Sequence, residues 1–89
     1  MTRKHSKLES VGVIIRQFRN ETGMKLEDVA VNMDVSAQYV GRLETGKNYP
    51  SIGTLIRVAE AMGVCPGDML KAIAEREKIM AAKTRPDAG

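Results

Sequence analysis

The amino-acid sequence predicts an all-α protein, a compact five-helix bundle whose C-terminal helix is extended. Two observations lead to this fold class. Apolar residues recur at spacings of three and four along most of the chain, and no stretch shows the strict alternation of a half-buried strand. Serine, glycine and proline residues then divide this helical pattern into five segments. With 89 residues, the chain is long enough for a single domain.

The first helix is expected over residues 8–22. Ser6 and Glu9 have the spacing of a capping box at its start, and Gly23 provides a stop at its end. Its buried face follows the spacing i, i+4 and i+7 and consists of Val11, Ile15 and Phe18. Two further apolar residues lie off this face, namely Val13 and Ile14.

A second helix is expected over residues 26–33 and a third over residues 37–45. The apolar face of the second helix consists of Leu26, Val29, Ala30 and Met33. Ser36 is a favourable N-cap for the third helix, which buries Val40 and Leu43 and stops at Gly46. Two short helices separated by about three residues suggest a helix-turn-helix. Its tight turn needs a residue that tolerates a left-handed backbone, and Asp34 can adopt one.

The last two helices are expected over residues 52–62 and 66–82. Ser51 caps the fourth helix, and Gly63 followed by Val64 ends it. Its inner face consists of Ile52, Leu55, Ala59 and Met62. Pro66 suits the first turn of the fifth helix, and one side of that helix presents Met69, Ile73, Arg76 and Met80. Residues 1–5 are expected to form a flexible basic arm, residues 6–82 the domain, and residues 83–89 a flexible tail.

Composition excludes several classes of function. The single Cys65 cannot form a disulfide within the chain, and it lies too far from His5 in sequence to predict a metal site. No apolar run reaches about 18 residues, so neither a membrane span nor membrane binding is expected, and the protein is predicted to be cytoplasmic. No nucleophile–base set or glycine-rich phosphate loop occurs, so we expect no enzyme and no cofactor. The net charge of +3 only weakly favours a polyanionic partner.

An ordered set of residues runs through the middle of the chain. It comprises Arg19 with Gly23, Asp28-Val29-Ala30, Val35-Ser36, Tyr39-Val40-Gly41-Arg42-Leu43-Glu44, Gly46-Lys47, Pro50-Ser51, Leu55 and Ala59-Glu60-Ala61-Met62-Gly63-Val64. This set resembles the lambda-repressor-like (Xre/Cro) helix-turn-helix family over about residues 11–70. The resemblance implies a transcriptional regulator that binds a near-palindromic operator in double-stranded DNA as a homodimer. Restriction–modification controllers and phage-type repressors are examples of such regulators.

The resemblance also implies roles for individual residues. The third helix would read bases through Ala37, Gln38 and Arg42. The DNA backbone would be contacted by Lys25, Ser36, Tyr39, Lys47 and Asn48. Arg19 and Glu44 match a partly buried structural ion pair between the first and third helices. The chain departs from the family pattern at Lys25 and Leu26, where the family places Ser or Thr and then a phosphate-binding Gln. Gly41 indicates either close approach to DNA or to a neighbouring helix, or plain tolerance of glycine.

The fifth helix continues past the usual core of the family, and its apolar residues have no obvious partner there. We expect a two-fold interface formed by Leu70, Ile73, Ile79 and Met80. The alternative is a protein-interaction module on the same fold, antitoxin-like or partner-binding, with weak or no DNA binding. The low net charge and the missing Gln favour that alternative. RNA binding is disfavoured because two Tyr and one Phe provide no stacking platform.

Overall fold

A computed structural model describes residues 7–84, and all regular structure in this range is helical. The helices are α1 (Lys7–Thr22), α2 (Leu26–Met33), α3 (Ala37–Glu44), α4 (Ile52–Ala61) and α5 (Pro66–Thr84). Their order confirms the predicted fold class. The expected end of the last helix at residue 82 is wrong, because α5 includes Lys83 and Thr84 and the next helix-breaking residue in the sequence is Pro86. Residues 1–6 and 85–89, and with them the Ser6 cap, the basic arm and most of the tail, lie outside the described residues.

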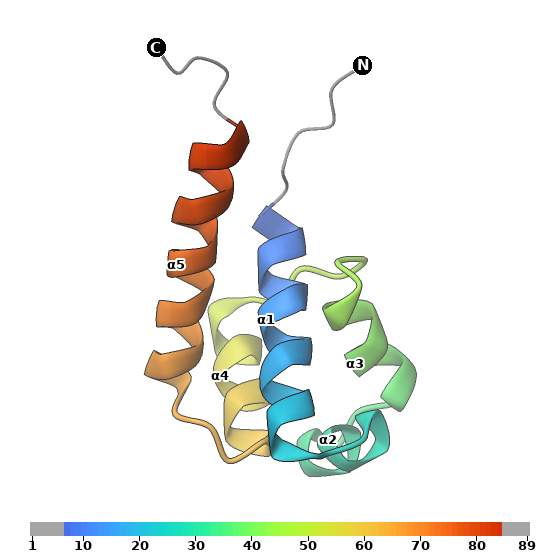
Figure 1. The fold of residues 1–89 in the computed structure, drawn as a ribbon. Helices are drawn as coiled ribbons and strands as arrows, with labels where there is room; N and C mark the ends of the chain where they lie inside the picture. Colours follow the sequence, from blue (N-terminus) through green and yellow to red (C-terminus); the bar gives the residue numbers. More distant parts are fainter. Residues whose placement is uncertain (1–6, 85–89) are drawn as a thin grey trace.

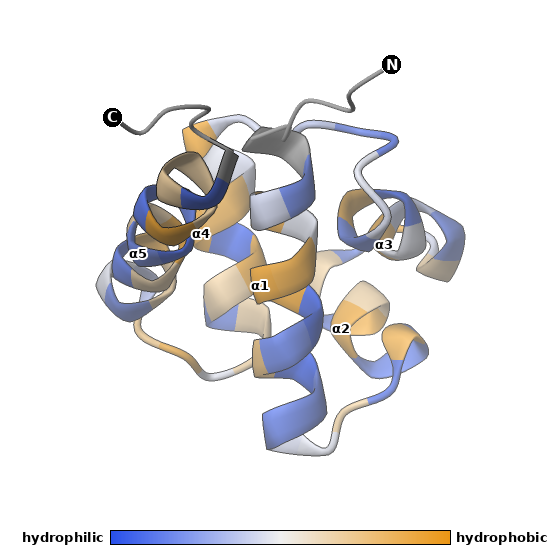
Figure 2. Ribbon diagram, turned by 45° about the horizontal axis from the view of Figure 1, so that its top comes forward, coloured by the Kyte–Doolittle hydropathy of each residue, from blue (hydrophilic) through white to orange (hydrophobic). Residues whose placement is uncertain are grey.

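The bundle is built around α1, which has neighbours on two sides (Figure 1). It packs against α3 on one side and against α5 on the other, while α4 contacts both α2 and α5. Hydrophobic and hydrophilic segments alternate along α1 and α5 in Figure 2, as expected of amphipathic helices. This arrangement leaves α3 at one edge of the bundle with α5 at the opposite edge.

Every helix contributes at least one fully buried side chain to a single core. These side chains belong to Ile15, Val29, Val40, Leu43, Val58 and Met69. Three of the methionines, Met33, Met62 and Met69, are buried in this core. Two expectations about the core are wrong. Ile14 is buried because α1 has neighbours on two sides and buries a wider stripe, whereas Ile52, at the very start of α4, extends past the core and is 62% exposed.

The turn between α2 and α3 has the backbone that the sequence predicts. Asp34 adopts the left-handed conformation with φ 61° and ends α2. The N–H of Asp34 donates to Val31 O (3.1 Å) and the N–H of Val35 donates to Ala30 O (3.0 Å). These bonds satisfy carbonyl groups at the end of α2, so the chain can reverse direction within a few residues and start α3.

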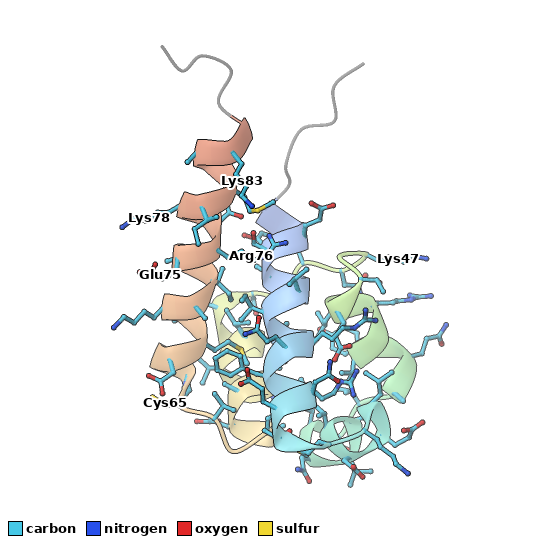
Figure 3. The ribbon with its side chains drawn as sticks, viewed as in Figure 1. Lys47, Cys65, Glu75, Arg76, Lys78 and Lys83 are labelled. Carbon is cyan, nitrogen blue, oxygen red and sulfur yellow. The ribbon has the colours of Figure 1, made fainter. Side chains whose placement is uncertain are left out.

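Side chains fix the remaining helices to one another. Asn32 Nδ2 of α2 donates to Ala61 O at the end of α4 (2.8 Å), and Arg57 Nη2 of α4 donates to Met33 O at the end of α2 (2.6 Å). Each helix therefore satisfies a C-terminal carbonyl of the other. On the opposite edge, Arg76 of α5 extends toward α1 (Figure 3), where its Nη1 donates to the Oγ of the fully buried Ser10 (3.1 Å).

The closest helix crossing lies between α1 and the end of α3. Gly12 of α1 is buried there, and an added Cβ would lie 2.3 Å from Glu44 O and 2.9 Å from Leu43 O. Both are backbone atoms of a helix, so they cannot move aside as a flexible side chain would. Only glycine allows α1 and α3 to approach each other this closely.

We predict that Gly12→Ala lowers the free energy of unfolding by about 1–3 kcal/mol, because the new methyl group forces the two backbones apart. Gly53→Ala is the matched control. It also lies in a helix, but its added Cβ would meet only Ser51 Oγ, at 3.9 Å. This control is expected to raise stability by up to about 1 kcal/mol through helix propensity. Chemical denaturation measures both changes, and an unchanged or increased stability of Gly12→Ala would contradict the prediction.

Candidate nucleic-acid interface

The short helix α3 is capped at both ends by its own sequence. Ser36 has extended backbone angles, and its Oγ accepts a hydrogen bond from the Tyr39 N–H (3.1 Å). At the other end, the N–H and the hydroxyl of Thr45 both donate to Gly41 O. A helix of eight residues is unstable in isolation. Its buried residues Val40 and Leu43 anchor it to the bundle instead.

An open cleft runs along the outer side of α3. It is lined by Arg16, Leu26, Ala37, Gln38, Gly41, Arg42, Glu44, Thr45, Lys47 and Asn48. Gln38 and Arg42 are four residues apart, so they share a face of the helix, and both are exposed. The structure therefore brings together the three residues expected to read bases and two of those expected to contact the DNA backbone.

The loop after α3 folds back onto the helix and positions the two backbone candidates. The N–H groups of Lys47 and Asn48 both donate to Arg42 O, at 2.9 and 3.2 Å. Gly46 makes this turn possible with φ 80°. The side chain of Lys47 points away from the bundle in Figure 3. Lys47 and Asn48 are thus fixed, through their main chain, relative to Arg42.

The other backbone candidates lie outside the lining of the cleft. Lys25 is exposed at the start of α2, and Ser36 is exposed at the cap of α3. Tyr39 is half-buried and packs against the core. These three residues follow the outer edge of the helix-turn-helix, from the start of α2 to the first turn of α3.

The start of α2 differs from the family pattern, and the structure shows the consequence. Lys25 carries no acceptor oxygen, so Asp28 supplies the cap, with its Oδ2 accepting a hydrogen bond from the Lys25 N–H (2.9 Å). Leu26, at the position of the family's Gln, is half-buried and lines the cleft without any side-chain donor. An added Cβ on Gly41 would meet only Leu26 Cδ1, at 3.9 Å. A neighbouring helix therefore does not require glycine at position 41, and close approach to DNA or plain tolerance remains.

A buried ion pair holds the end of α3 against α1. Arg19 Nε donates to Glu44 Oε2 (2.5 Å), and Arg19 Nη2 donates to Glu44 Oε1 (3.0 Å). The Glu44 side chain is only 1% exposed and that of Arg19 is 15% exposed. Arg19 Nη1 also donates to Met24 O (3.0 Å), which ties the turn before α2 to the same cluster. The hydrogen bond from Glu44 raises the pKa of Arg19 above its ordinary value, so its charge is retained at every pH of practical interest.

A second arginine, which sequence reasoning missed, joins this cluster. Arg16 Nε lies 3.2 Å from Glu44 Oε1, and the Arg16 side chain is 57% exposed. Its spacing of three residues from Arg19 places both on one side of α1, and this spacing was the available signal. Arg16 lines the cleft next to α3, so it belongs to the candidate interface.

The expected interface residues of α5 are divided between surface and core. Leu70 is 37% exposed and Ile79 is 53% exposed, whereas Ile73 and Met80 are half-buried. Leu70 and Ile73 also line an apolar groove together with Val11, Tyr49, Pro50, Ser51, Ile52 and Leu55. Within residues 7–84, no cluster of side chains could hold a metal ion. No helix in that range is long and apolar enough to span a membrane, and Cys65 is exposed and unpaired with any other cysteine.

Comparison with known proteins identifies relatives of the whole bundle. A helix-turn-helix family model matches residues 15–70. The chain is 34% identical over 59 residues to the HTH-type transcriptional regulator DdrOP3 of Deinococcus deserti, covering 66% of this chain and 46% of that protein. The chain thus spans about half the length of that relative.

Solved structures show the same fold. The clp gene regulator ClgR from Corynebacterium glutamicum superposes with a TM-score of 0.81 at 30% identity, over 91% of this chain and 86% of that one. The restriction-modification controller protein C.Esp1396I, solved as a tetramer with its natural 35 base-pair operator, superposes with a TM-score of 0.73 at 21% identity. That match covers 81% of this chain and 95% of the controller chain.

Proposed function

The chain belongs to the lambda-repressor-like helix-turn-helix family, and on this premise we propose that it is a sequence-specific DNA-binding transcriptional regulator. The proposal places its activity in the cytoplasm and assigns it no catalysis. One observation carries it. The exposed residues Gln38 and Arg42 share the outer face of a capped helix, and Lys47 and Asn48 flank them in the same cleft.

The chemistry of α3 suits the major groove of DNA, which is about 12 Å wide and admits one helix. The amide of Gln38 can bond to adenine through N6 and N7, and the guanidinium of Arg42 can bond to guanine through O6 and N7. The methyl group of Ala37 can contact a thymine methyl. Because these residues lie on the first two turns of α3, the N-terminal part of the helix would enter the groove.

The surrounding polar residues would hold the duplex in register. Lys47 and Asn48 follow α3, while Lys25, Ser36 and Tyr39 lie at or near the starts of α2 and α3. Contacts from such residues to phosphates carry little sequence information, but they fix the protein on the duplex and make its affinity depend on salt. Selectivity then depends on Ala37, Gln38 and Arg42.

The charge of the cleft favours DNA over a protein partner as its ligand. Arg16, Arg42 and Lys47 supply positive charge, and all three are exposed. The one acidic residue of the cleft lining is Glu44, which is buried and paired with arginines. An antitoxin-like or partner-binding module without DNA binding would present an apolar or acidic surface here. The regulator could act as a restriction–modification controller or a phage-type repressor.

We propose in addition that the protein is a homodimer whose subunits meet through α5, with an interface that includes Leu70, Ile73, Ile79 and Met80. The exposure of Leu70 and Ile79 supports this proposal. The apolar groove beside Leu70 adds the exposed residues Tyr49 and Ile52 to the same surface. A two-fold dimer on a near-palindromic operator would separate its recognition helices by about 34–36 Å, one turn of B-DNA.

Selection of bound sequences from random duplex DNA tests the proposed function, and Arg42→Ala tests the reading helix. Selection is expected to yield a site with two related halves. On that duplex, Arg42→Ala should cost about 1–3 kcal/mol of binding free energy and relax the preference at one base position of each half. Lys47→Ala is the matched control and should weaken cognate and scrambled duplexes alike. An unchanged ratio of the two affinities for Arg42→Ala would show that Arg42 does not read a base.

Sedimentation velocity at micromolar concentration tests the dimer. The wild-type chain is expected to sediment as a dimer, and Ile79→Glu as a monomer, because a carboxylate would be buried in the interface without a partner. Val31→Glu is the matched control. It replaces an apolar residue that is 77% exposed on α2, and it should remain dimeric. A monomeric wild type, or a dimeric Ile79→Glu, would contradict the proposed interface.

A further inference from the structure

Arg16 is a charged residue of the cleft that the proposed readout does not use. It comes from α1, whereas most of the cleft lining comes from α3 and the loop that follows. Arg16 and Glu44 also line a second hollow, on the outer face of α1, with Val13, Gln17 and Asn20. Arg16 therefore stands on the ridge between the two hollows, beside α3 and not on its reading face.

The charges around Glu44 do not balance. Arg19 occupies both carboxylate oxygens of Glu44 and is itself largely buried. Arg16 adds one contact through Nε to the oxygen Oε1, which also accepts from Arg19. One carboxylate thus faces two guanidinium groups, and the surplus positive charge lies on the more exposed of them, Arg16.

The contact with Glu44 orients Arg16 without covering it. It uses the Nε donor, while most N–H donors of a guanidinium sit on the two terminal nitrogens. Because Glu44 is itself held by Arg19, the anchor of Arg16 is rigid. A guanidinium held by one edge, with more than half of its side chain exposed, is suited to binding an anion.

The cleft also lacks a donor at the point where α2 begins. Leu26 lines the cleft there and offers only an apolar side chain, while Lys25 next to it is not part of the lining. A duplex seated on α3 would bring its sugar-phosphate backbone past the neighbouring helices. Resting on the proposed function, we infer that Arg16 binds a phosphate of the DNA strand that flanks α3, and so supplies the backbone contact that Leu26 cannot make.

The test compares the salt dependence of DNA binding in four proteins: wild type, Arg16→Gln, Arg16→Lys and Lys78→Gln. Lys78→Gln is the matched control for charge, because Lys78 lies on α5 and points away from α1 and α3 in Figure 3. Fluorescence anisotropy is measured with the selected duplex and with a scrambled duplex between 50 and 200 mM salt. Chemical denaturation confirms that each variant is folded, and Glu44 keeps Arg19 as its partner in all four.

We expect Arg16→Gln to weaken both duplexes equally and to reduce the magnitude of the slope of log K against log salt by about 0.9, the contribution of one phosphate contact. The loss of affinity relative to wild type then shrinks about threefold between 50 and 200 mM salt. Arg16→Lys keeps the charge and should keep the wild-type slope, with part of the affinity lost because lysine lacks the planar fork. Lys78→Gln should match the wild type.

Three results would overturn the inference. If Arg16→Gln has the slope of Lys78→Gln, Arg16 does not contact phosphate. If its cognate and scrambled affinities change by different factors, Arg16 reads a base. If Arg16→Gln and Arg16→Lys lose the same slope, the effect passes through Glu44. Failure of the wild type itself to bind any duplex would overturn the proposed function, and this inference with it.

Discussion

The buried carboxylate of Glu44 is the interaction on which the position of α3 depends. A carboxylate that is removed from water is costly unless it is paired and hydrogen-bonded, and Glu44 meets this requirement only where Arg19 can reach it. The glycine at position 12 makes the approach possible, because any side chain there would collide with the backbone of Glu44. Charge and close packing therefore select the same crossing of α1 and α3.

This crossing turns a short helix into a rigid surface. Eight residues cannot hold a helix by themselves, so α3 takes its stability from neighbours at each end. Asp34 and Ser36 fix its start relative to α2, and α2 is tied to α4 by Asn32 and Arg57. Glu44 fixes its end. Gln38 and Arg42 are thus presented in one orientation before any ligand arrives, which lowers the cost of ordering them on binding.

Much of the fold could be predicted because it depends on local signals. Helix boundaries follow from caps and stops such as Ser36, Ser51 and Gly63, and the left-handed turn follows from the short polar side chain of Asp34. The features that sequence reasoning missed arise from distant contacts. Ile14 is buried because α1 has two neighbours, and Ile52 is exposed because the first residue of α4 extends past the core.

The candidate site divides in the same way. The reading residues follow from their positions in a recognised helix, and the structure places them in one cleft. The roles of Gly12 and Arg16 depend on how closely α1 approaches Glu44, a residue 28 or more positions away in the chain. No periodic pattern contains that distance. The pairing of Asn32 and Arg57 with helix ends is hidden from the sequence for the same reason.

The most direct test of this account is a double-mutant cycle between Arg19 and Glu44, using Arg19→Met, Glu44→Leu and the double variant. Chemical denaturation gives the free energy of unfolding of each. If the pair holds α3 as described, each single variant loses about 3–5 kcal/mol because one charge is left buried and unpaired, and the double variant loses clearly less than the sum. Losses that add within about 0.5 kcal/mol would contradict the account, since Arg19 and Glu44 would then act independently.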